Sequence, residues 1–266
     1  IKRLGIPYFK MTDGPHGVGA LGTFFLKKTT YFPVAICRAA TWNPTLSKEY
    51  GKAIAQEVRD VGYHMNLAPG LNIQRTPLCG RNFEYQTEDP LLNAILGTAV
   101  VKGLQDQRVA ACIKHYVANN QEFKRFKHST QVNERALREI YLPAFKMAIE
   151  EGDAWSVMAC YNRVNGIHGC EHERLLRDIL MDEWGFRGFV VSDWFATRYT
   201  DTAKCLKAGL SLEMPKSICY KNKRLRKGLE GGKFGMDLIE GNFKWLLRVM
   251  FLTLLFDDPE KLPPCS

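Results

Sequence analysis

The chain has 266 residues, of which 45% are hydrophobic and 24% charged. These proportions indicate a globular protein with one sizeable core and exclude a disordered or fibrous chain. The net charge of +9 gathers largely between residues 216 and 233, where we expect a solvated basic surface, because no motif that reads nucleic acid accompanies it.

Cofactor, metal and membrane signals are not found in the sequence. The eight cysteines lack the C-x-x-C spacing of a zinc site, and Cys112 and Cys160 are expected to be buried thiols. No P-loop, G-x-G-x-x-G or serine-hydrolase pattern occurs, so no metal or nucleotide cofactor is predicted. The apolar stretch 245–256 is too short to span a bilayer. No signal peptide opens the chain, which slightly favours a cytoplasmic location.

Strand-like and helix-like segments alternate along the chain. In chain order they are a strand at 7–11, an apolar run at 32–36, a helix at 45–61, a strand at 64–68, a long loop at 69–89, a helix at 91–105, a strand at 109–117, a helix at 134–150 that Asn133 caps, a strand at 155–161, a helix at 173–184 that Gly185 ends, a strand at 189–193, a helix at 202–208, a strand at 210–214 and a helix at 236–256. The alternation predicts a mostly parallel sheet within an α/β fold. We expect one domain over 1–256, followed by a tail or linker stub over 257–266.

Two of the predicted strands end in polar residues. Asp193 and Trp194 follow one apolar run, and Lys114 and His115 end another. In an α/β barrel the active site lies where the C-terminal ends of the strands meet. A carboxylate beside an indole at that edge favours sugar chemistry, with Asp193 attacking an anomeric carbon and Trp194 holding a pyranose ring.

Each of these residues also has a purely structural interpretation. Asp193 could cap the next helix, and Trp194 could be a core aromatic. Adjacent residues on a regular strand point to opposite faces, so Lys114 and His115 reach one ligand only if the strand twists or bulges. Lys114 could instead pair with a buried acid, and His115 could be a satisfied core histidine.

Three further candidates lie in predicted loops. Asp13 stands in a Gly-Pro-rich turn, where its carboxylate could bind two vicinal hydroxyls or cap the turn. Arg81 and Arg125 offer forked donors, with a surface position as the alternative for each. The length of the loop 69–89 and its content of arginine and aromatic residues favour a functional role.

Nine runs together resemble the N-terminal barrel domain of glycoside hydrolase family 3, chiefly its β-glucosidases. They are 3–7 (RLGIP), 12–17 (TDGPHG), 40–44 (ATWNP), 67–75 (LAPGLNIQR), 80–85 (GRNFEY), 114–122 (KHYVANNQE), 134–139 (ERALRE), 158–162 (MACYN) and 192–194 (SDW). They stand in the family's order over about residues 1–215, and the combination is specific. The resemblance implies a TIM-type (β/α)8 barrel, incomplete or irregular here because only six or seven strand candidates are found.

The resemblance also implies a role for each candidate residue. Asp193 matches the catalytic nucleophile of a retaining enzyme. The positions that bind hydroxyls in the −1 subsite match Asp13, Arg81, Lys114, His115, Arg125 and Tyr161, and apolar walls of that subsite match Met158 and Trp194. The Asp-Gly-Pro form of the first motif is similar to that of glucosidases, which favours a terminal β-D-glucosyl residue as substrate.

Two departures from the family pattern concern the acid/base. In the family's β-glucosidases a C-terminal α/β sandwich domain supplies the acid/base Glu, and we expect a barrel without that domain because the sequence stops at Ser266. The Gly-His-Gly loop of the β-N-acetylglucosaminidases is not found after Lys114-His115. Glu84 and Glu122 match positions that orient Arg or Lys. We therefore expect the acid/base to come from outside this chain segment, and the apolar helix 236–256 to contact a partner chain, a second copy or another domain.

Three functions remain open at this point. The first is a retaining β-glucosidase that acts on a β-glucoside or oligosaccharide without a cofactor. The second is a catalytically weak sugar-binding remnant or partner-dependent subunit, which would keep the pocket without its acid. The third is a Schiff-base aldolase that uses Lys114 and would leave Asp193 and Arg81 without a purpose.

Overall fold

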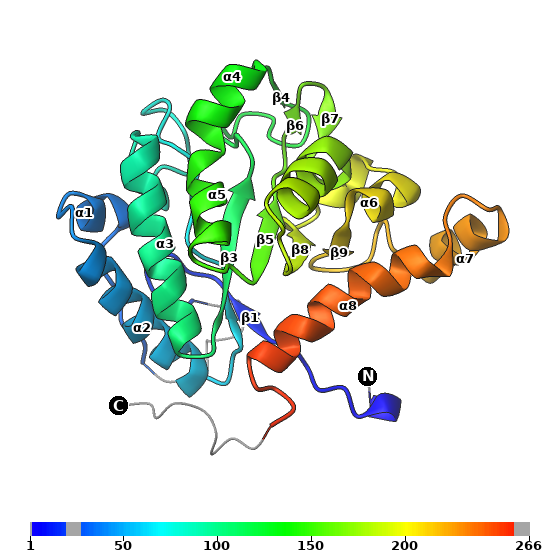
Figure 1. Ribbon diagram of the computed structural model, residues 1–266, viewed down its shortest axis with the longest axis horizontal. Coiled ribbons are helices and arrows are strands. Elements are labelled where there is room, and N and C mark those ends of the chain that lie inside the picture. Colours follow the sequence, from blue (N-terminus) through cyan, green and yellow to red (C-terminus); the bar gives the residue numbers. More distant parts are fainter. Residues whose placement is uncertain (1, 20–27, 258–266) are drawn as a thin grey trace.

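The computed structural model describes residues 2–19 and 28–257. Its centre is a parallel sheet of six strands in the order β1-β2-β3-β5-β8-β9 (Figure 1). The strands are β1 Met11–Thr12, β2 Met65–Asn66, β3 Ala110–Tyr116, β5 Ser156–Ala159, β8 Phe189–Ser192 and β9 Leu210–Leu212. The predicted α/β fold with an incomplete barrel is therefore confirmed.

Both faces of this sheet are buried, as a parallel sheet requires. In β3, Ala111 and Ile113 belong to the larger apolar cluster, which also holds residues of the surrounding helices, whereas Ala110 and Cys112 face a second, smaller cluster. This alternation follows from the two-residue period of a strand. Figure 1 shows α2, α3 and α5 on one side of the strands, with α8 running past β9 toward β1 on the other.

Two of the longest helices, α2 and α3, begin at residues that sequence rules favour. The helices are α1 Ala35–Ala39, α2 Pro44–Asp60, α3 Pro90–Asp106, α4 Glu134–Ala136, α5 Pro143–Glu150, α6 Thr202–Ala208, α7 Asn222–Glu230 and α8 Met236–Leu252, with the further helical segments η1 Lys2–Leu4, η3 Leu137–Tyr141, η4 Gly169–Glu171, η5 Arg174–Glu183 and η6 Ala196–Tyr199. Asn43 and Asp89 cap α2 and α3 through side-chain bonds to Leu46 and Leu92, and a proline follows each cap. Most of the predicted helices are thus confirmed to within a residue or two.

One predicted helix is wrong as a continuous element. The segment 134–150 divides into α4, the wider-turned η3 and α5, although Asn133 caps its start as expected. The reason is Pro143, which has no N–H to donate and whose ring collides with the carbonyl four residues earlier. The amide of Leu142 instead reaches back five residues to the carbonyl of Leu137, at 2.9 Å.

Other differences concern short elements. The predicted strands at 7–11 and 64–68 shrink to β1 and β2, and the apolar run at 32–36 leads into α1. A second sheet was not predicted; it pairs β4 Ser129–Thr130 with β6 Arg163–Val164, and β6 with β7 Ile167–His168. The basic stretch contains α7, which lies away from the sheet in Figure 1.

The last described helix, α8, contacts the inner face of the sheet. Val249 belongs to the smaller cluster with Phe189 and Val191 of β8, and the Arg248 guanidinium donates to the carbonyl of Arg187 at 3.1 Å. Within the part of the chain that the structure describes, no helix is at once long and apolar enough to cross a membrane. The predicted tail lies outside the described residues from residue 258 onward.

Candidate active site

A cavity of about 160 Å³ opens at the C-terminal edge of the sheet. It is lined by Asp13, Arg81, Lys114, His115, Met158, Tyr161, Asp193 and Trp194. Eight of the nine residues predicted as site residues thus line one cavity, although they come from five separate parts of the chain. The ninth, Arg125, lies beside it.

Asp193 follows β8 and is 5% exposed. Its Oδ1 accepts the backbone N–H of Trp194 at 2.7 Å, whereas its Oδ2 has no hydrogen-bond partner among the described residues. Burial raises the pKa of Asp193 to about 6, against the opposing effect of the Arg81 guanidinium. A buried carboxylate with a free oxygen in a cavity is suited to nucleophilic attack.

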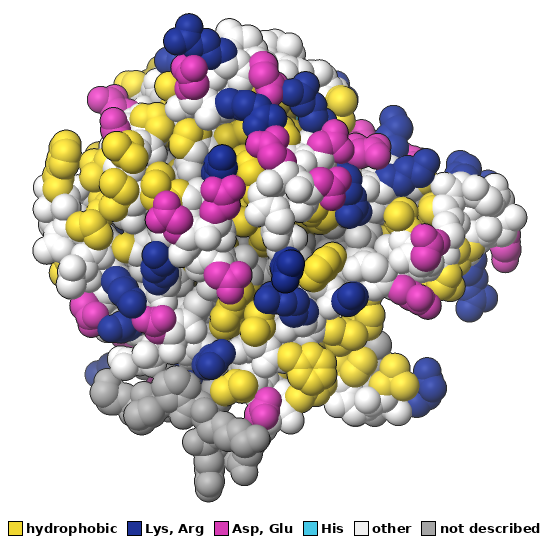
Figure 2. All heavy atoms as spheres, in the orientation of Figure 1, with side chains coloured by type: hydrophobic (Ala, Val, Ile, Leu, Met, Phe, Trp, Pro, Cys, Tyr) yellow, Lys and Arg dark blue, Asp and Glu magenta, His cyan; other side chains and the backbone are white. Residues whose placement is uncertain are grey.

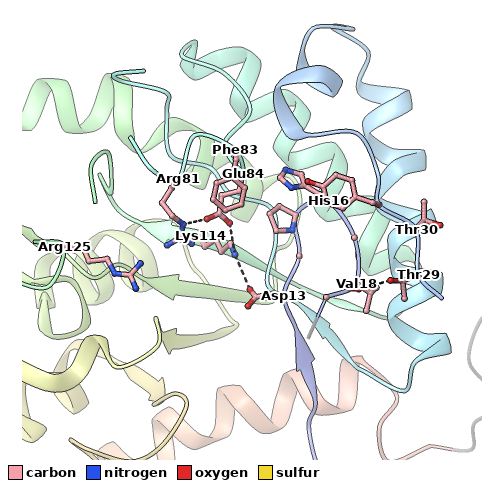
Figure 3. A pocket seen from close by; sticks show the side chains of 15 residues that line it. Asp13, His16, Val18, Thr29, Thr30, Arg81, Phe83, Glu84, Lys114 and Arg125 are labelled. Carbon is pink, nitrogen blue, oxygen red and sulfur yellow. Dashed lines mark hydrogen bonds and ion pairs between the residues drawn. The ribbon is translucent and has the colours of Figure 1, made fainter. Parts of the chain in front are cut away.

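Glu84 holds the two neighbouring cations in place. Its carboxylate contacts the Arg81 guanidinium and lies 3.0 Å from Nζ of Lys114, which in turn lies 3.6 Å from Oδ1 of Asp13. Figure 3 shows this row of dashed contacts from Arg81 through Glu84 and Lys114 to Asp13. Lys114 therefore pairs with a buried acid, as the structural interpretation proposed, and also reaches the cavity.

The charges in this row are strongly fixed. Burial alone would raise the pKa of Glu84, but Lys114 and Arg81 hold it below its ordinary value. Burial alone would lower the pKa of Lys114, but Glu84 and Asp13 raise it instead. Glu84 therefore stays ionised and Lys114 stays protonated, which disfavours both a proton-donating Glu84 and a Schiff base on Lys114.

His115 reaches the cavity because β3 is irregular at its end. The register between β3 and β5 shifts between Ile113 and Tyr116, so the strict alternation of faces breaks at Lys114 and His115. The backbone N–H of His115 donates to Oδ1 of Asn72 at 3.0 Å, which fixes this part of the strand. The expected condition for both side chains to meet one ligand is thus fulfilled.

The hydrogen bonds of His115 determine its tautomer. Burial and the Arg81 charge hold the pKa of His115 well below its usual value, so the ring is neutral. Nη2 of Arg81 lies 2.6 Å from Nε2 and can only donate, so the ring proton lies on Nδ1 and donates to the Tyr85 hydroxyl at 3.0 Å. The Tyr85 hydroxyl donates to the carbonyl of Asn119 at 3.2 Å. Nε2 therefore has no proton to donate to Asp193, whose Oδ2 is 3.5 Å away.

Arg125 lies at the junction of two larger cavities. Its guanidinium stacks over the Tyr161 ring at 4.1 Å and donates from Nη1 to Oε2 of Glu122 at 2.9 Å. It lines a cleft of about 680 Å³ that adjoins the small cavity and shares Asp13, Arg81 and Lys114 with it. In Figure 3, Arg125 lies on the opposite side of this cleft from His16.

Sequence reasoning missed several residues of the site. Asn72 and Tyr85 lie within the runs 67–75 and 80–85, but no local pattern in these runs indicates that both residues hydrogen-bond to His115. His16, Tyr31 and Phe83 line the larger cleft, with ring centroids of Tyr31 and Phe83 about 6 Å from that of His16. The sequence feature that could have indicated these three residues is the presence of aromatic side chains in or near turns that contain Gly and Pro.

Comparison with known proteins gives concordant matches. The model of the glycosyl hydrolase family 3 N terminal domain matches residues 1–249. Beta-glucosidase BoGH3A of Bacteroides ovatus is 42% identical over 274 residues, which covers 95% of this chain and 36% of that protein. An exo-alpha-(1->6)-L-arabinopyranosidase of Bifidobacterium breve is 42% identical over 225 residues, which covers 82% of this chain and 30% of that protein.

A solved structure agrees with these sequence matches. Beta-glucosidase 3B from Thermotoga neapolitana, in complex with glucose, has a TM-score of 0.88 to this chain and is 44% identical. The match covers 95% of this chain and 36% of that one. The chain therefore spans about a third of the length of the relatives that it matches.

Proposed function

Because the chain belongs to glycosyl hydrolase family 3, we propose that it forms the nucleophile-bearing barrel of a retaining β-glucosidase. The observation that carries this proposal is the 160 Å³ cavity, in which the buried Asp193 carboxylate faces a ring of hydrogen-bonding groups. A cavity of this size suits one pyranose ring. The Bacteroides ovatus relative is named a β-glucosidase, and the Thermotoga neapolitana β-glucosidase has glucose bound in its solved structure.

The proposed reaction is a double displacement. Oδ2 of Asp193 attacks C1 of the bound glucoside, the bond from C1 to the aglycone oxygen breaks, and a glucosyl ester forms on Asp193. A water molecule then attacks C1, releases glucose with retained configuration and restores the carboxylate. Asp13, Arg81, Lys114, His115 and Tyr161 are assigned to the sugar hydroxyls. Met158 and Trp194 are assigned to the apolar face of the ring, and Arg125 to the mouth of the site.

The acid/base is assigned to a group outside the described residues. A retaining glycosidase needs a second carboxyl group about 5–5.5 Å from the first to protonate the leaving oxygen. Glu84 is held ionised by two cations, and Glu122 is paired with Arg125. Without an acid, attack on substrates with poor leaving groups should be about 10²–10⁴-fold slower, whereas activated aryl glucosides should react more readily.

The test is covalent trapping, because it needs the nucleophile and the sugar cavity but little acid assistance. The protein is incubated with 2,4-dinitrophenyl 2-deoxy-2-fluoro-β-D-glucoside, and its intact mass is measured beside that of Asp193→Asn. We expect one glucosyl adduct, mapped to Asp193 and missing from the variant. A folded protein without an adduct would contradict the proposal and favour a sugar-binding remnant or partner-dependent subunit.

The name of one relative points to arabinopyranosides as a second candidate class of substrate. A relative as similar as the β-glucosidase is named an exo-arabinopyranosidase, and it releases a pyranose that lacks the hydroxymethyl group of glucose. The corresponding 2-fluoro α-L-arabinopyranosyl reagent therefore serves as the comparison. Faster trapping by the glucosyl reagent is expected, and the reverse order would move the assignment to arabinopyranosides.

A further inference from the structure

A third cavity lies next to the proposed sugar site. It measures about 630 Å³ and is lined by Glu122, Lys124, Arg125, Phe126, Lys127 and Tyr199. Arg125 lines both this cavity and the 680 Å³ cleft, and it stacks on Tyr161, which lines the cavity of Asp193. The aglycone of a glucoside bound at Asp193 would therefore reach the 630 Å³ cavity by passing Arg125.

The walls of this cavity carry uncompensated positive charge. Its single carboxylate, Glu122, is paired with Arg125. Lys124 and Lys127 are exposed, and no ion pair is found for either ammonium group within the described residues; Lys124 lies only over the ring of Phe123. Arg198 is also exposed and adds a guanidinium over the Phe126 ring at 5.7 Å.

The neighbouring cleft does not share this imbalance. There Glu84 and Asp13 face Arg81 and Lys114, so the cations of the cleft have acidic partners. An anionic group on a substrate would therefore gain little in the cleft and more beside Lys124 and Lys127. Cations around a hollow also focus their field there, which raises the local concentration of anions.

Aromatic rings complete the recognition surface. The rings of Phe126 and Tyr161 meet edge to face at 4.8 Å, and Tyr199 is half exposed at the rim. Rings combined with lysine and arginine side chains suit a planar aromatic ligand that carries a negative charge. Because the 630 Å³ cavity is open to solvent, a planar aromatic ligand can enter it with either face toward the protein rings.

We infer that the 630 Å³ cavity takes the aglycone and that Lys124 and Lys127 select β-glucosides of carboxylated aromatic alcohols. This inference rests on the proposed glucosidase function and names its substrate class. The charges are exposed, so the preference should be moderate, of the order of 10-fold, and it should weaken as salt screens the lysines.

The test measures binding rather than turnover, so that it does not depend on the acid/base. Dissociation constants of 4-carboxyphenyl and 4-carbamoylphenyl 1-thio-β-D-glucopyranoside, which differ in charge but hardly in shape, are measured by calorimetry. We expect the carboxylate to bind about 10-fold more tightly at about 0.02 M salt, with less preference at about 0.5 M. The double variant Lys124→Gln, Lys127→Gln should reduce the ratio to about twofold, whereas Lys223→Gln on α7 should not change it.

Two failures are distinguishable. Equal binding of both thioglucosides, or a preference that the double variant keeps, would overturn the inference and leave the glucosidase proposal standing. If neither thioglucoside nor glucose itself binds to the folded protein, the sugar site is wrong, and the proposed function falls with the inference.

Discussion

At Asp193 the fold keeps a carboxyl group in surroundings that disfavour its charge. The side chain is almost fully buried, and only one of its oxygens accepts a hydrogen bond from the described residues. The nearby His115 has no proton on Nε2 to donate to Asp193, because this nitrogen accepts a hydrogen bond from Arg81. The ionised form is stabilised by the positive charge of Arg81 and Lys114 and by hydrogen bonds from the Trp194 backbone and the Tyr161 hydroxyl.

This arrangement predicts a pH-dependent gain of stability in Asp193→Asn. The pKa of Asp193 rises from 3.8 to about 6 on folding, so the carboxyl group favours the folded state while protonated in both states, below about pH 4. That contribution is lost as the pH rises through about 6. At pH 8 the buried charge should cost about 3 kcal/mol, which the uncharged Asn avoids.

Urea unfolding of the wild type and of Asp193→Asn at pH 4 and pH 8 measures this effect. The variant should be more stable at pH 8, and the difference should shrink toward zero at pH 4. Equal stability of the two proteins at both pH values would mean that the folded site does not raise the pKa of Asp193.

At the scale of elements, the loop between β2 and α3 brings the site together. It was predicted to be functional from its length and composition, and it carries Arg81, Glu84 and Tyr85, all of which contact the strand-end residues. The positions of Arg81 and Lys114 depend on Glu84, because its carboxylate is the ion-pair partner of both.

Glu84→Gln should therefore be costly. The change leaves two buried cations with one partner fewer, which should destabilise the protein by about 3–5 kcal/mol and weaken binding of glucose. Chemical unfolding and a glucose titration measure the two effects. Glu139→Gln is the matched control, because Glu139 pairs with Arg135 on an exposed surface and should change stability by less than about 1 kcal/mol. A similar small effect at both positions would refute the role given to Glu84.

The sequence predicted the strand-end site better than the irregular elements around it. Apolar runs that end in Lys-His or Asp-Trp are strong local signals, and their strands meet at one edge of the sheet. The shift of register that turns His115 into the cavity depends on pairing with β5, which no local pattern records. The hairpin of β6 and β7 is indicated in the sequence by the pair Asn165-Gly166, which is typical of a two-residue hairpin turn. Both residues adopt positive φ in the turn between the two strands.

At the scale of the whole molecule, α8 covers the inner face of the unclosed sheet and shields it from solvent. Six parallel strands leave one side open, and Val249 of α8 packs there with residues of β3, β5 and β8. The other side of the helix is apolar as well: Figure 2 shows hydrophobic side chains over α8, and Phe243 and Phe251 are among the exposed aromatics. The expected contact of this helix with a partner stays a prediction, since part of its apolar surface is already used within the chain.

These two sides of α8 should respond differently to truncation. Val249 is fully buried, so Val249→Ala removes packed methyl groups from the inner cluster and should lower the free energy of unfolding by about 2 kcal/mol. Phe251 is 57% exposed and stacks mainly on Phe256, so Phe251→Ala should cost less than about 1 kcal/mol in this chain. The urea unfolding midpoints of the two variants and of the wild type measure the two losses of stability. If Phe251→Ala proved the more damaging change, α8 would not close the sheet through Val249. The cavity of Asp193, whose strand β8 rests on the same cluster, would then need another support.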